Sequence, residues 1–237
     1  MPLAHGHNPM NSPHFCRPEA YWLFAESLPA LETTQGLLQA ALSVSLHALE
    51  DYPPARVEQR LEEMAERVTA RARRNSAEAR LAHLHHVLYV EEGFLGDRSR
   101  YYNPLNSYLP AVLESRRGIP ITLALIYKAV AERVGLEVEG LNSPGHFLLR
   151  VRDSRGWLLI DPFHGGKALT EDEAYDLVDR TFGYAVGRTY SLSEPATHAQ
   201  WIERILLNLQ NNFSQQGFRN DHGAMTELQH LLAAIEI

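Results

Sequence analysis

The stretch RRGIPITLALIYKAVAERVG, residues 116–135, predicts the helix on which the fold is built. Pro120 stands where a helix accepts proline at its first position, and Gly135 stands where a helix commonly ends. The roughly 15 residues between them make a helix about 22 Å long. We expect this helix to be covered on most sides and to lie at the centre of its domain, because few of its residues are polar. Those polar residues are Thr122, Lys128, Glu132 and Arg133.

The chain before this helix has a helical period. Apolar residues recur three and four positions apart, for example in ARVEQRLEEMAERVTARARRN, which begins at residue 55. The first residues, MPLAHGHNPMNSPHF, are rich in Pro, Asn and His and predict a disordered tail over residues 1–15. We predict an N-terminal helical region over residues 16–95 and assign it a packing role.

After Gly135 the period becomes that of strands. LEVEGL alternates, whereas HFLLRV and WLLIDPF are apolar and are separated by RDSRG, which predicts a hairpin. TEDEAYDLVDR returns to helix, and two further amphipathic stretches predict a C-terminal helical pair over residues 198–237. The predicted fold class is therefore α+β, with the strands inside a domain at residues 96–190.

The composition limits the classes of function. The 237 residues carry a formal net charge of −7, which disfavours a broad nucleic-acid surface. No apolar run approaches the ~18 residues of a membrane span, and the N-terminus lacks the basic and apolar regions of a signal peptide. Cys16 is the single cysteine, so no intramolecular disulfide can form. We expect a cytoplasmic protein that binds neither nucleic acid nor membranes; the sequence does not indicate its oligomeric state.

The predicted hairpin brings a histidine to an aspartate. If its turn is centred between Asp153 and Ser154, His146 and Asp161 lie directly opposite on one face, with Cβ atoms roughly 5 Å apart. Gly156 makes a shifted register an alternative. Given the pairing, Asp161 accepts from one ring nitrogen of His146 and leaves the other nitrogen to take a proton. A helix N-terminus facing this pair would favour a developing anion.

Three segments resemble a known family. YYNPLNSYLPAVLESRRGIPITLALIYKAVAERVGL, PGHFLLRV and IDPFHGG look like the transglutaminase-like superfamily, relatives of the papain-type cysteine peptidases, and within it like the bacterial SirB-type branch. The resemblance is strong over about residues 76–170. It implies a papain-like transglutaminase core behind a helical region, often followed by tetratricopeptide-type helices. It also implies a catalytic base at His146 and an orienting acid at Asp161.

The nucleophilic cysteine of that motif falls on Pro120, with Gly118 two residues before it and Ala124 four after it. Proline has no nucleophilic heteroatom, and it lacks the backbone N–H that can bind an oxyanion. In general, losing one oxyanion donor costs ~2.7–4 kcal/mol of transition-state stabilisation. We therefore expect a catalytically silent domain. It would act as a binding or scaffolding module whose cleft takes a peptide or a small polar ligand, with a protein or peptide partner.

Alternatives for the same residues stay open. Thr122 or Ser107 can supply a substitute hydroxyl, although Thr122 points about 200° around the helix from Pro120. The simpler interpretation is that Ser107 caps a helix and that Thr122 caps or faces solvent. Cys16 is interpreted as a dispensable thiol of the flexible tail. His146 and Asp161 can also be a buried pair that only fixes the hairpin.

His164 adds a further alternative, because two histidines and one carboxylate suit zinc or iron. Their spacing matches no strong metal motif, so we expect no metal and no other cofactor. A second function nevertheless stays open, namely a hydrolase or acyl-transfer enzyme with a relocated Ser/Thr nucleophile or a metal-bound water at His146 and Asp161. The candidate ligand contacts are Asn106, Ser107, Thr122, His146, Asp161 and His164.

Overall fold

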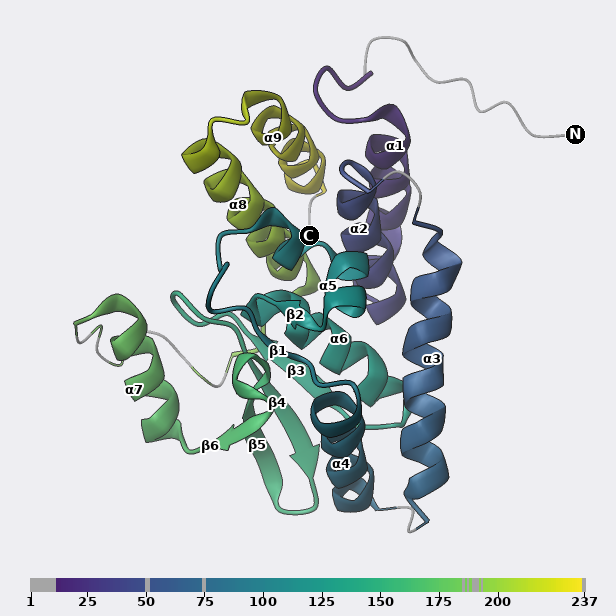
Figure 1. Ribbon diagram of the computed structural model, residues 1–237, viewed down its shortest axis with the longest axis vertical. Helices are drawn as coiled ribbons and strands as arrows, with labels where there is room; N and C mark the ends of the chain where they lie inside the picture. Colours follow the sequence, from purple (N-terminus) through teal and green to yellow (C-terminus); the bar gives the residue numbers. More distant parts are fainter. Residues whose placement is uncertain are drawn as a thin grey trace, which may run out of the picture.

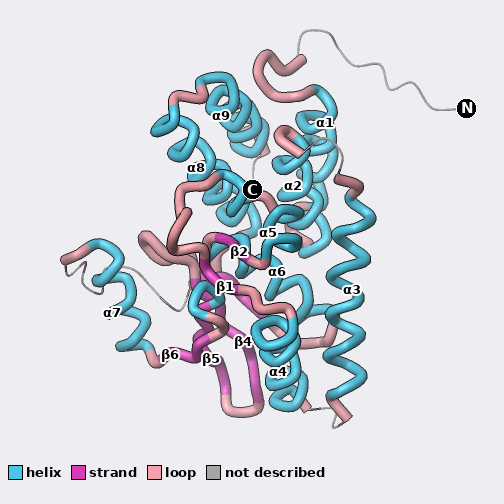
Figure 2. The backbone as a smooth tube through the Cα atoms, viewed as in Figure 1, coloured by secondary structure: helices cyan, strands magenta, loops and turns pink. Residues whose placement is uncertain are grey.

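The computed structural model describes residues 12–49, 52–73, 76–184 and 194–235, together with Val186, Arg188 and Leu192. Figure 1 shows helices gathered around α6, with a small sheet beside them and α7 at the outer side of the sheet; Figure 2 shows the same arrangement by type of element. The α-helices are α1 (Pro18–Ser27), α2 (Thr34–Leu46), α3 (Pro54–Arg71), α4 (Ala77–His85), α5 (Leu109–Ser115), α6 (Pro120–Arg133), α7 (Glu171–Phe182), α8 (His198–Gln216) and α9 (Arg219–Ala233). The strands are β1 (Leu95–Gly96), β2 (Arg117–Gly118), β3 (Val138–Leu141), β4 (Leu148–Asp153), β5 (Gly156–Asp161) and β6 (Lys167–Leu169). Short 3-10 helices span Leu28–Ala30, Pro104–Ser107 and Pro162–His164, and a π-helical turn at His86–Glu91 continues α4.

The N-terminal helices follow the predicted pattern. The long helix α3 starts with Pro54 at its first position and buries one stripe of apolar residues, while its charged residues face outward. In contrast, α2 is buried on most sides; its N-terminus is closed by Thr33, whose hydroxyl accepts from the N–H of Gly36 at 3.0 Å. The stripe of α3 consists of Val57, Leu61, Met64, Ala65 and Val68.

The segment before α1 is held against α9. Residues 1–11 of the predicted tail lie outside the described residues. The backbone N–H groups of His14, Phe15 and Cys16 donate to the carboxylate of Glu227 at 2.7, 3.1 and 2.8 Å. Cys16 is 4% exposed, and burial together with the charge of Glu227 raises the pKa of its thiol to about 12. The prediction that Cys16 belongs to a flexible tail is wrong, because its backbone is bonded to Glu227, which lies 211 residues later in the sequence.

Helix α6 lies at the centre, as its apolar sequence predicts. It begins at Pro120 and ends just before Gly135, which has a φ of 74°. Every residue from Pro120 to Ala131 is buried. Thr122 is 0% exposed, so the prediction that it caps the helix or faces solvent is wrong. A helix packed on all sides leaves no solvent-facing position.

The four strands β3, β4, β5 and β6 form an antiparallel sheet in sequence order. Asp153 pairs with Gly156, which places the hairpin turn one residue later than the predicted centre. The carboxylate of Asp153 accepts from the N–H of Arg155 at 2.8 Å, and Gly156 takes a φ of 131°. The predicted register is therefore wrong. His146 lies in the turn before β4, and Asp161 pairs with Lys167 of β6.

The sheet packs on both faces. One face contributes to the main core, which also contains α6 and the N-terminal and C-terminal helices, and the other face is covered by α7. The predicted α+β fold is confirmed; the domain boundaries stay predictions. None of the helices in the described residues is long and apolar enough to cross a membrane. The main-core face carries Val138, Leu149, Val151 and Ile160, and the face under α7 carries Leu141, Leu148, Leu159 and Leu169.

An ion-pair cluster fixes the chain just before α6. The side chain of Glu92 is 7% exposed and contacts three arginines. Arg60 lies 3.1 Å from its carboxylate, Arg67 contacts it from the same helix α3, and Arg116 lies 3.1 Å away. Arg116 has a left-handed φ of 60° where α5 ends. Because this buried carboxylate is fully paired, it fastens the segment that leads to Pro120 onto α3.

Candidate functional site

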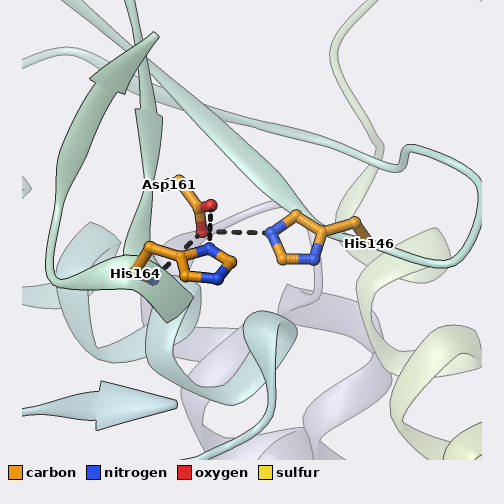
Figure 3. Close-up of side chains that lie close together, drawn as sticks. All are labelled: His146, Asp161 and His164. Atoms are coloured by element: carbon orange, nitrogen blue, oxygen red, sulfur yellow. Dashed lines mark hydrogen bonds and ion pairs between the residues drawn. The ribbon is translucent and has the colours of Figure 1, made fainter. Parts of the chain in front are cut away.

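His146, Asp161 and His164 meet where β5 ends (Figure 3). Nε2 of His146 lies 3.0 Å from Oδ1 of Asp161, and Nδ1 of His164 lies 2.5 Å from Oδ2 of the same carboxylate. The two imidazole rings stand either side of the carboxylate, with centroids 6.1 Å apart. The structure thus brings His146 and Asp161 into contact, although not through the register expected from the sequence.

The local sequence orients Asp161. Its side chain caps the short helix that follows, because Oδ1 also accepts from the N–H groups of Phe163 at 3.0 Å and His164 at 3.3 Å. Gly165 and Gly166 then turn the chain with φ near 70°. The carboxylate is therefore held in one orientation by its own turn before it meets either histidine.

Asp161 is ionised. Burial opposes this charge and by itself raises the pKa of the carboxyl, whose residue is 1% exposed. The hydrogen bonds from His146 and His164, with their electrostatic attraction, outweigh burial and hold the pKa of Asp161 well below its usual range. The negative charge of Asp161 in turn helps to raise the pKa of the nearby Tyr89, although burial of that phenol is the larger cause.

The other side of the His146 ring faces the start of α6. Pro120 and His146 line the same cavity, which measures about 10 Å³. That volume is about the space of a single water molecule. Within the described residues, Nδ1 of His146 has no hydrogen-bond partner. The remaining walls of this cavity are Tyr101, Ile121, Gly145, Phe147, Arg204 and Asn208.

The candidate residues outside this cluster lie elsewhere. The hydroxyls of Thr122 and Ser107 are buried and form no hydrogen bond with any described residue, so neither is bonded to His146. Ser107 ends a 3-10 helix and Tyr108 precedes α5, so the prediction that Ser107 caps this helix is wrong. Asn106 donates from its side chain to the carbonyl of Arg100 at 2.7 Å and accepts at its own carbonyl from Ile119. Asn106 therefore supports the chain before Pro120.

A larger pocket opens on the His164 side. It measures about 250 Å³ and is lined by Asp161, His164, Lys167, Leu169, Leu177 and Arg180. The ammonium of Lys167 donates to Glu173 at 2.9 Å. Arg180, on α7, is exposed and forms no ion pair with any described residue. Both oxygens of the charged Asp161 carboxylate are occupied by hydrogen bonds, so Arg180 is the cation at this pocket that an added anion could pair with.

Sequence reasoning missed Lys167 and Arg180. A signal for Lys167 exists, because a short strand after the GG turn must pair with β5 and so returns Lys167 to Asp161. Tyr101 and Arg204 were missed as walls of the small cavity, and no local pattern marks them. They come from segments more than 100 residues apart and meet only in the folded chain.

Comparison with known proteins gives a consistent result. A family model described as the transglutaminase-like superfamily matches residues 55–207, which is more than half of the chain. A UPF0162 protein from Xylella fastidiosa is 38% identical over 138 residues, covering 57% of this chain and 49% of the relative. The UPF0162 protein PA3419 from Pseudomonas aeruginosa is 31% identical over 182 residues, covering 76% and 66%. F-box only protein 21 from Mus musculus is 41% identical over 103 residues, covering 40% of this chain and 16% of that protein.

The chain spans about half the length of the Xylella fastidiosa relatives that it matches. No solved structure matches it. The matched residues 55–207 include Pro120, His146, Asp161 and His164. By the family match, the chain belongs to the transglutaminase-like superfamily.

Proposed function

We propose that this protein is a non-catalytic, transglutaminase-like binding module. The observation that carries the proposal is that Pro120 shares the cavity of His146, at the position where the family motif has its nucleophile. His146 and Asp161 keep the geometry of a base and its orienting acid, but no heteroatom faces them from α6. We also propose, on the motifs quoted above, that the chain belongs to the SirB-type branch.

The size of the cavity supports the same conclusion. An acyl substrate must place its carbonyl carbon within about 3–3.5 Å of a nucleophile. A space of about 10 Å³ walled by Tyr101 and Arg204 holds no such group. Pro120 also has no N–H to stabilise an oxyanion at the start of the helix. Both the attacking atom and the room for its target are therefore missing on this side of His146.

A relocated hydroxyl is not favoured by the geometry. A substitute nucleophile has to lie within hydrogen-bond reach of the base, about 2.6–3.2 Å. Nε2 of His146 is bonded to Asp161, and neither the Thr122 nor the Ser107 hydroxyl forms a hydrogen bond with Nδ1 or with any other described residue. These buried hydroxyls belong to the packing around α6, where each costs some stability.

The ligand is a small anion rather than a peptide. The pocket beside Asp161 and His164 measures about 250 Å³, which suits a small molecule and not an extended chain. Lys167 and Arg180 provide cationic side chains at its rim, and Leu169 and Leu177 provide apolar walls. Arg180 can grip a carboxylate or a phosphate with two parallel hydrogen bonds. We infer a small carboxylate or phosphate compound as the ligand.

The absence of turnover is tested first. The purified protein is incubated with amine donors and glutamine peptides, and with generic amide and ester substrates, with and without added Zn²⁺. We expect no turnover above that of the His146→Ala variant. Turnover that disappears in His146→Ala, while the variant keeps the wild-type melting temperature, would refute the proposal.

Anion binding is tested by calorimetry on metal-free protein, with inorganic phosphate and malonate as probes. We expect binding of at least one probe and at least a fivefold weaker affinity in Arg180→Ala, because the bidentate contact is lost. Arg98→Ala is the matched control, since Arg98 is also exposed but does not line the pocket. Equal loss in both variants, or no binding of either probe, would count against a ligand at this pocket.

A further inference from the structure

We propose that His146, Asp161 and His164 form a binding site for a divalent transition-metal ion, with zinc as the ion first expected. Each residue offers one ligand atom, and these atoms all lie within 4.8 Å of one another. Two imidazoles and one carboxylate suit Zn²⁺ or Fe²⁺, whereas Mg²⁺ and Ca²⁺ prefer oxygen ligands throughout. The inference goes beyond the proposed function, which concerns an anion and does not require a metal.

The spacing is close to that of a metal site. With metal–ligand bonds of about 2.0–2.2 Å in a tetrahedral arrangement, neighbouring ligand atoms lie roughly 3–3.5 Å apart. Nε2 of His146 lies 3.0 Å from Oδ1 of Asp161, Nδ1 of His164 lies 2.5 Å from Oδ2, and one ligand atom from each residue lies within 4.8 Å of the others. The second contact has to widen by less than about 1 Å. His164 can make this movement because it ends a short helix and its side chain is 28% exposed.

The residues packed around the three proposed ligands hold them in position. The carboxylate of Asp161 is held in one orientation because its Oδ1 accepts from the N–H groups of Phe163 and His164. The ring of His146 stands edge-on to Phe163, with centroids 5.9 Å apart. Tyr89 packs under the GG turn, where a Cβ on Gly166 would lie 2.1 Å from its ring. Two of the three ligands are therefore positioned before any ion arrives.

Binding requires each histidine to present a lone pair where it now offers an N–H to Asp161. The proton then resides on the other ring nitrogen, Nδ1 of His146 and Nε2 of His164. The cavity next to His146 has about the room of one water molecule, which can accept the proton of Nδ1. His164 lines the open pocket, so its Nε2–H can be hydrated there. The change of tautomer therefore leaves no buried N–H without a partner.

The ion has a route in and an open coordination position. Asp161 and His164 both line the pocket of about 250 Å³, so an ion held by the three ligands is reached from that side. Three protein ligands leave at least one position for water or an anion. Of the nearby cations, Lys167 is offset by Glu173, and Arg180 is the one whose charge an anion in the pocket would balance.

The test measures Zn²⁺ content after equilibrium dialysis and the visible absorption of Co²⁺ bound in its place. All proteins span residues 1–237 and carry His5→Ala and His7→Ala, which remove the histidines of the HGH stretch at residues 5–7. We expect one ion per chain, and at least a tenfold weaker affinity in His164→Ala. His86→Ala is the matched control, because His86 is exposed, lies beside Glu91 and is far from Asp161 in sequence.

His164→Ala is chosen because the His164 side chain is partly exposed, and thermal unfolding checks that the variant is folded. His164→Cys should restore binding, since a thiolate is also a zinc ligand. Zn²⁺ binding that is absent, or that is equally strong in His164→Ala, would overturn the inference. Anion binding by metal-free protein together with no Zn²⁺ binding would leave the proposed function standing and remove only the metal site. Zn²⁺ binding together with no anion binding by the metal-free protein would remove only the anion site.

Discussion

The two sides of the His146–Asp161 pair differ in what they can admit. On the α6 side, His146 faces Pro120 across about 10 Å³, in a cavity that Tyr101 and Arg204 also line. On the other side, Asp161 and His164 border a pocket of about 250 Å³ with cationic side chains. The first side is where the family's chemistry would take place, and the second is where we propose that a ligand binds.

If the proposed function is right, this difference teaches that a hydrogen-bonded His–Asp pair can persist without the chemistry of the family. Asp161 remains ionised and oriented by its own turn, and it needs neither a nucleophile nor a substrate to stay so. The same carboxylate bonds to a second histidine that faces the open pocket. The proposed absence of catalysis on one side of His146 is therefore compatible with the proposed binding on the other.

The pocket beside His164 follows the turn at Gly165 and Gly166, and Gly166→Ala should disrupt this turn. The new Cβ would lie 2.1 Å from the ring of Tyr89, at a φ of 72° that disfavours alanine. We expect the free energy of unfolding to fall by about 3 kcal/mol or more, measured by denaturant titration. Gly183→Ala is the control, because its φ is 75° but nothing lies within 4 Å of the added Cβ. It should cost about 1–2 kcal/mol. Equal costs at both positions would show that the packing of Tyr89 does not constrain the turn.

As pH decreases, the contact between α4 and α6 should lose stability before Asp161 is protonated. His85 lies on α4, and its Nε2 is 2.8 Å from the hydroxyl of Tyr127 on α6. Burial lowers the pKa of His85 from 6.5 to about 4. Between these pH values the unfolded chain binds a proton that the folded chain does not, so the free energy of unfolding falls as pH decreases, by roughly 3 kcal/mol in all.

His85→Gln separates this effect from others, because glutamine does not titrate but can still bond to Tyr127. The slope of unfolding free energy against pH between about 6.5 and 4 should become flatter in this variant. An unchanged slope would assign the acid sensitivity to other groups, and His85 would then be charged or exposed in the folded protein.

Helix α7 supplies Arg180 to the open pocket, and Thr170 closes its N-terminus. Thr170 and Glu173 form a capping box in which each side chain bonds to the other's backbone N–H. Thr170→Ala should lower the free energy of unfolding by about 1 kcal/mol. We expect amide hydrogen exchange to increase in α7 and to stay unchanged in α6. Faster exchange in α6 would show that the two sides are coupled.

The fold was largely predictable because its helix boundaries are marked by individual residues. Pro120 and Gly135 delimit α6, and its apolar composition predicts its central position. The hairpin was predictable as a hairpin, but its register depended on a side-chain contact. Asp153 bonding to Arg155, with Gly156 at positive φ, moved the turn by one residue. A single side-chain contact of this kind leaves no periodic pattern in the sequence from which it could be predicted.

The candidate site was predictable only in part. Motif spacing brought out Pro120, His146 and Asp161, whereas the volumes on the two sides of His146 depend on packing between distant segments. Tyr101 and Arg204 close one side, although 102 positions separate them in the sequence numbering (204 − 101 − 1). The burial of Thr122 was not predicted, because helical periodicity only separates a buried face from an exposed one. Helix α6 is buried on every side between Pro120 and Ala131, so no such separation exists.

The central claim is that position 120 faces a competent base, His146, but supplies no attacking atom. Pro120→Cys tests it directly, through the apparent pKa of the introduced thiol measured by ultraviolet thiolate absorbance. Cys16 stays silent in this titration because burial raises its pKa to about 12. We predict a thiol pKa at least about one unit below the usual ~8.5, and a rise toward or above that value when His146→Ala is added. A pKa at or above ~8.5 that does not respond to His146→Ala would show that His146 does not serve position 120, and would contradict the account.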